Sequence, residues 1–164
     1  MEIKTAVDKF MHDLGDIYDA EQQFLRGQQE MVSQATDTRL QKMIQTHIGE
    51  TEQQIKNLEQ VFEMMGKQPE PQECPGARGL VTEAKTVLSE TTTGPVKDTV
   101  IGGSAMKVEH YEMVSYNDLI DAAELMGEKQ VARLLERNLR QEEKTAQKLE
   151  RAAPKLMKKA AGVK

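Results

Sequence analysis

Residues 101–123 read IGGSAMKVEHYEMVSYNDLIDAA, and the predicted fold depends on this stretch. Apolar residues recur in it every three or four positions, which is the spacing of one face of an α-helix. Glu109 and Glu112 interrupt that face, where a bundle of helices would normally bury leucines. A carboxylate buried without a partner is costly, so an acid in an apolar register is normally paired, protonated or bound to a metal. The stretch therefore predicts a buried helix with a functional acidic face.

The same helical spacing appears in three other segments. Thr5 and Asp8 form the pattern of a capping box at the start of a first helix. Gly66 and Gly127 follow the second and third helices, and Pro154 is expected to end the fourth. The four predicted helices cover residues 5–33, 37–65, 95–126 and 128–152.

The segment between the two pairs of helices, residues 66–94, has a different composition. Pro69, Pro71 and Pro75 interrupt it, and residues 80–88 suggest a short helix. Two tight turns and one long crossover are typical of ferritin-like four-helix bundles. We therefore predict an all-α fold with a single ferritin-like domain over residues 1–164, built from two antiparallel hairpins. The predicted basic tail at residues 155–164 contains Lys155, Lys158, Lys159 and Lys164.

The composition restricts the class of protein. Hydrophobic residues make up 38% of the 164 residues and aromatic residues only 4%, as expected for a helix-rich chain. The net charge of -5 argues against general nucleic-acid binding, and no apolar run is long enough to cross a membrane. The first residues lack the layout of a signal peptide, and the lone Cys74 has no partner for an internal disulfide. We therefore expect a cytoplasmic protein.

An acidic residue lies on or beside the apolar face near the middle of each long helix. Because these positions can share one level of a bundle, their carboxylates predict a site for two metal ions. Hard oxygen ligands favour iron, with manganese as the alternative. The candidate ligands are Glu21, Glu50, Glu109, Glu112 and Glu142, together with His47 and Gln53.

The roles of several neighbouring residues stay open at this point. His47, one turn before Glu50, could bind the metal or support a carboxylate that does. Gln53 stands where the usual di-iron pattern has a histidine. Tyr18 and Tyr116 lie about one turn from glutamates and could donate hydrogen bonds to them.

Several motifs resemble those of the YciF-type ferritin-like stress proteins of bacteria. They are Tyr18-Asp-Ala-Glu21, His47-Ile-Gly-Glu50-Thr51, Lys107-Val-Glu-His-Tyr-Glu112 and the segment from Leu139 to Glu142. The resemblance covers nearly the whole chain. It implies a four-helix bundle with a rubrerythrin-like dinuclear metal site, a homodimer and a role in stress responses. Carried over residue by residue, it makes Glu21, Glu50, Glu109, Glu112 and Glu142 the metal ligands.

Three functions are compatible with this pattern. A redox di-iron protein would react with peroxide or dioxygen and would need a separate electron donor, because one cysteine cannot form a four-cysteine iron site. A scaffold protein of the stress response would use the metal, if it binds one, only to tie the helices together. Iron storage in a cage ranks last, because no cage interface is recognisable in the sequence.

Overall fold

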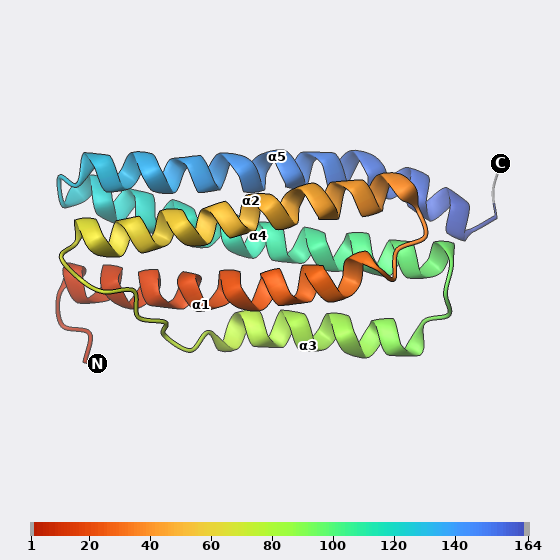
Figure 1. Cartoon of the computed structure of the whole chain (residues 1–164), viewed down its shortest axis with the longest axis horizontal. Coiled ribbons are helices and arrows are strands. Elements are labelled where there is room, and N and C mark those ends of the chain that lie inside the picture. The colour runs from red at the N-terminus through yellow and green to blue at the C-terminus, as the bar shows by residue number, and fades with distance from the viewer. Residues whose placement is uncertain (1, 163–164) are drawn as a thin grey trace.

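The computed structural model describes residues 2–162, and the regular elements in this range are all helices. Four of them are long and lie side by side, while α3 packs along the outside of α1 and α4 (Figure 1). The predicted all-α class is thereby confirmed. Within the same range, no helix is long and apolar enough to cross a membrane. The helices are α1 (Ala6–Val32), α2 (Thr38–Met64), α3 (Pro75–Glu90), α4 (Pro95–Leu125) and α5 (Lys129–Ala160).

The connections determine the direction of each helix. Short turns join α1 to α2 and α4 to α5, so each pair is antiparallel (Figure 1). The connection between α2 and α4 instead runs back along the molecule through α3, so α2 and α4 point the same way. This arrangement places the central turns of all four long helices around a common core.

Local sequence signals explain where the helices begin and end. Thr5 and Asp8 exchange the two hydrogen bonds of a capping box at the start of α1. Asp37 accepts hydrogen bonds from the first backbone N–H groups of α2. Gly66 and Gly127 have φ angles of 69° and 79°, a left-handed conformation that glycine adopts readily after a helix. These signals put the predicted limits of the first three long helices within one residue of those observed.

Two predicted boundaries were wrong. Helix α5 does not end at Pro154 but continues through it to Ala160, because Leu156 beyond the proline is buried in the core. Residues 155–160 of the predicted basic tail are therefore helical, and Lys164 lies outside the described residues. Helix α3 starts at Pro75 rather than near residue 80, because proline suits a first helical turn and Cys74 caps it.

Asp98, near the start of α4, is buried and ties that end of the helix to the turn between α1 and α2. Its Oδ1 accepts a hydrogen bond from the backbone N–H of Thr36 at 2.7 Å. Its Oδ2 accepts one from the Thr36 hydroxyl at 2.6 Å. Both carboxylate oxygens are therefore satisfied, although the residue is only 2% exposed.

We expect Asp98→Ala to lower the free energy of unfolding by about 2 kcal/mol, because two hydrogen bonds to a charged group are lost. Urea denaturation followed by circular dichroism measures this change. Asp121→Ala is the matched control, since Asp121 is exposed on the same helix, and should change stability by less than about 0.5 kcal/mol. Equal stabilities for the two variants would contradict the role given to Asp98.

Candidate metal centre

Four glutamates and one histidine meet in the middle of the molecule. Helix α1 contributes Glu21, α2 contributes His47, α4 contributes Glu109 and Glu112, and α5 contributes Glu142. Each glutamate is at most 1% exposed, and His47 is 4% exposed. Four of these residues each offer a potential ligand atom that lies within 4.8 Å of the other three atoms. They are His47, Glu109, Glu112 and Glu142. All four long helices therefore contribute to one acidic cluster in the core.

His47 is the cationic partner of this cluster. Its Nε2 lies 3.2 Å from Glu109 Oε1 and 3.4 Å from Glu142 Oε2, and its Nδ1 lies 3.3 Å from Glu50 Oε2. Burial by itself lowers the pKa of His47, but the carboxylates of Glu109 and Glu50 raise it, and the net pKa is about 9. In the absence of a metal, His47 is thus an imidazolium at neutral pH.

Buried neutral side chains also donate hydrogen bonds to the glutamates of the cluster. The Tyr116 hydroxyl donates to Glu21, and the side-chain amide of Gln54 donates to Glu142. Asn138 donates to the Tyr116 hydroxyl at 3.0 Å and accepts a bond from Asn57 at 2.7 Å. This buried network fixes the orientation of two carboxylates and leaves their remaining oxygens directed elsewhere.

The carboxyl groups are destabilised as anions in the metal-free protein. Burial raises the pKa of Glu21 to about 7, although the hydrogen bond from Tyr116 and the charge of His47 lower it in part. Burial and neighbouring carboxylates raise the pKa of Glu112 and of Glu142 well above the usual range. One imidazolium therefore does not compensate for this many buried carboxylates.

Several oxygens in the cluster have no hydrogen-bond partner, and these atoms test whether a metal would fit. Buried polar atoms are nearly always satisfied in folded proteins, so a group of unsatisfied carboxylate oxygens fits a missing cation. The donor set of carboxylates and one imidazole suits iron or manganese better than zinc. The five oxygens are Glu21 Oε2, Glu109 Oε2, both oxygens of Glu112, and Glu142 Oε2.

The structure brings together most, but not all, of the predicted ligands. Glu21, Glu109, Glu112 and Glu142 meet as described. Glu50 lies at the edge, where its side chain is 19% exposed and its Oε2 contacts His47 and the Thr145 hydroxyl.

Gln53 is not brought into the cluster. It is exposed and donates a hydrogen bond to Asn57 at 3.0 Å. Gln54 occupies the buried position instead, because the inward face of α2 passes through Thr51, Gln54 and Leu58. Gln54 lies three residues after Thr51 and four before Leu58, and this helical spacing is the signal that could have identified it.

The remaining predictions for nearby residues differ in outcome. Tyr116 does donate to a glutamate of the cluster, but that glutamate is Glu21 of α1. Tyr18 does not; it donates to Glu59 at 3.0 Å. Asn138 was missed, although it lies four residues before Glu142 and so belongs to the same face of α5.

The chain is similar to known bacterial proteins over nearly its whole length. Residues 5–162 match the family described as "Domain of unknown function (DUF892)". Protein YciF of Escherichia coli strain K12 is 35% identical over 150 residues, which cover 91% of this chain and 90% of that protein. The resemblance to YciF-type stress proteins is thereby confirmed.

Two solved structures are similar in fold. The crystal structure of the E. coli stress protein YciF matches with a TM-score of 0.91 and 34% identity, covering 96% of this chain and 99% of that one. YcfI from Rhodopseudomonas palustris, for which a structural role has been suggested, matches with a TM-score of 0.89 and 38% identity. That alignment covers 91% of this chain and 95% of that one.

We expect the metal-free protein to lose stability as the pH rises from about 5 to 9. Glu21 binds its proton more tightly when folded, with a pKa of about 7 against 4.5, so its contribution is complete at low pH and is lost as the pH rises. The pKa of His47, about 9 against 6.5, acts in the same direction. Melting temperatures measured in a chelator across this range test the expectation, and a rise in stability over the range would contradict it.

Glu112→Gln should remove part of this pH dependence. The substitution keeps the shape of the side chain but cannot ionise, so we expect the metal-free variant to be more stable than the wild type at pH 8 by on the order of 1 kcal/mol or more. At pH 5 the difference should be smaller, because the raised pKa of Glu112 favours its protonated form. Urea denaturation at both values measures the difference, and Glu124→Gln, at an exposed position of α4, is the control.

Proposed function

We propose that this chain, which belongs to the DUF892 family and is similar to YciF, is a stress-response protein whose long helices form a ferritin-like bundle around a carboxylate-rich dinuclear metal centre. The observation that supports this function is the convergence of four buried glutamates with five unpartnered oxygens. Iron is the proposed metal, and manganese is the alternative.

The positions of the side chains suggest which residues would hold the two ions. His47, Glu109, Glu112 and Glu142 would hold one ion, since a ligand atom of each lies within 4.8 Å of the others, and Glu21 would extend the site towards the second ion. Glu50 would support His47 from the edge. When bound, two ferrous ions would supply the electrons needed to reduce peroxide or dioxygen.

The chain's own residues would prepare the site for this chemistry. The hydrogen bonds from Tyr116 and Gln54 hold one oxygen each of Glu21 and Glu142, so that the other oxygen of each would be available to a metal ion. Apolar side chains pack on both sides of the cluster. Electrons would have to come from a separate donor protein, because Cys74 is the only cysteine of the chain. We also propose a cytoplasmic homodimer.

A second candidate is a non-catalytic structural protein of the stress response. The observation that favours it is the contact of His47 with Glu109 and Glu142, because a protonated imidazole partly takes the place of a cation. The suggested structural role of YcfI agrees with this alternative. In that case a bound metal would only tie the helices together.

Metal content tests the proposed centre. After anaerobic loading with ferrous iron and removal of the excess, we expect about two iron ions per chain in the wild type, and fewer than one in Glu112→Gln because a ligand is lost. Elemental analysis measures the ratio, and Glu124→Gln should retain the wild-type value. Iron-free wild-type protein after loading would rule the centre out.

Peroxide reactivity separates the two candidate functions. In the loaded wild type, we expect hydrogen peroxide to oxidise the iron at least about tenfold faster than it oxidises free ferrous iron, because the site would hold two ferrous ions close together. Stopped-flow absorbance follows the reaction. Bound iron that reacts no faster than free iron would favour the structural protein.

A further inference from the structure

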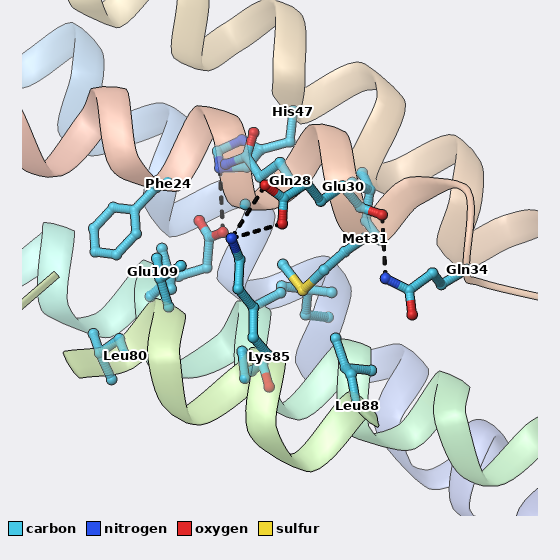
Figure 2. Close-up of a pocket in the computed structure, with 18 of the residues that line it drawn as sticks. Phe24, Gln28, Glu30, Met31, Gln34, His47, Leu80, Lys85, Leu88 and Glu109 are labelled. Carbon is cyan, nitrogen blue, oxygen red and sulfur yellow. Dashed lines mark hydrogen bonds and ion pairs between the residues drawn. The ribbon is translucent and has the colours of Figure 1, made fainter. Parts of the chain in front are cut away.

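A second feature lies directly beside the glutamate cluster. A cavity of about 190 Å³ extends between α1, α3 and α4 and reaches His47 and Glu109 (Figure 2). Apolar side chains such as Phe24, Leu80 and Leu88 form most of its wall. For comparison, an apolar cavity of about 150 Å³ is large enough to bind benzene. The space therefore suits a small organic molecule.

The inner end of the cavity is polar. His47 and Glu109 belong to its lining. His47 Nε2 is paired with Glu109 Oε1 and Glu142 Oε2, whereas Glu109 Oε2 has no hydrogen-bond partner. Both residues are more than nine-tenths buried. An apolar cavity that arose only from imperfect packing would not be expected to end on an ion pair with an unsatisfied carboxylate oxygen, because such groups are costly to bury.

An exposed ion pair lies at the outer end of the cavity, which is not fully enclosed. Lys85 of α3 reaches across to Glu30 of α1, and their charged atoms are 2.8 Å apart (Figure 2). Both side chains are more than half exposed, and ion pairs of this kind contribute little to stability. A ligand could thus enter between α1 and α3 without unfolding either helix.

We propose that this cavity binds a small uncharged molecule with an apolar body and one hydroxyl or hydroperoxyl group, which is directed to His47 and Glu109. The apolar wall would hold the hydrocarbon part. A neutral head is favoured over an anionic one because it would lie beside several buried carboxylates. This inference rests on the proposed function in one respect, because the bound molecule would be a substrate of the proposed metal centre. Binding of the molecule in the cavity does not itself require a metal.

Gly27 offers a way to fill the cavity without disturbing its wall. It lies in the wall on α1, and a Cβ atom added there would meet only Val81 Cγ2, at 3.8 Å. Gly27→Leu should therefore fold, and the better helix propensity of leucine should compensate for small adjustments. Gly79→Leu is the matched control, because Gly79 lies on α3 outside the cavity and a Cβ there would meet nothing within 4 Å.

The test compares benzyl alcohol with toluene, which lacks the hydroxyl group, by ligand-observed NMR titration. The purified protein is used before and after metal removal. We expect wild-type protein and Gly79→Leu to bind benzyl alcohol about fivefold more tightly than toluene, because one hydrogen bond is gained. Gly27→Leu should weaken binding of both compounds at least tenfold, because its side chain occupies the cavity.

Three results would overturn the proposal: no saturable binding of benzyl alcohol to the wild type, unchanged affinity in Gly27→Leu, or toluene binding as tightly as the alcohol. Elemental analysis of the same samples keeps this inference separate from the proposed metal centre. Binding of the alcohol by a protein that takes up no iron would refute the metal centre and leave the ligand site standing. A protein that takes up two iron ions but does not bind the alcohol would refute the ligand site and leave the metal centre standing.

Discussion

The burial of four carboxylates at one level of the core is the constraint on which the rest of the structure depends. Their desolvation is tolerated only if protons, hydrogen-bond donors or cations compensate for it. Tyr116 and Gln54 donate hydrogen bonds to two of the carboxylates, and His47 provides one positive charge. Two apolar clusters lie on either side, one around Phe10 and Leu135 and the other around Leu40 and Ile101. These clusters provide the hydrophobic burial that allows the polar level to exist.

The crossover helix α3 links this core to the neighbouring cavity. Its start is held by Tyr111 of α4, whose hydroxyl lies 3.1 Å from Cys74 Sγ and 3.3 Å from Asp16. Gly76 is required for this contact, since a Cβ there would lie 2.9 Å from the Tyr111 hydroxyl. Towards its other end, Leu88 of α3 is buried in the second apolar cluster, and Lys85 forms a surface ion pair with α1. The helix is therefore held at both ends and covers the cavity between them.

The helices and most of the buried glutamates could be predicted from helical periodicity and capping signals in the sequence. Features that depend on tertiary packing could not be predicted in this way. Glu112 and Glu142 were correctly expected in the core because each lies in register with apolar residues three or four positions away, such as Tyr116 and Leu139. Gln53 was preferred to Gln54 because a familiar spacing from Glu50 was used instead of the inward face of α2. Pro154 lies inside α5 because burial of Leu156 outweighs the hydrogen bond that proline removes, and no local signal reports that burial.

The two candidate functions differ in what balances the negative charge of the buried glutamates, which is either protons and His47 or bound metal ions. When ionised, the four buried glutamates carry four negative charges, and the His47 imidazolium offsets only one of them. The metal-free core must therefore keep protons on several carboxyl groups, in agreement with the raised pKa values of Glu21, Glu112 and Glu142. One divalent ion would leave two charges uncompensated if His47 became a neutral ligand. Two divalent ions would balance all four, which is the charge count of the proposed dinuclear centre.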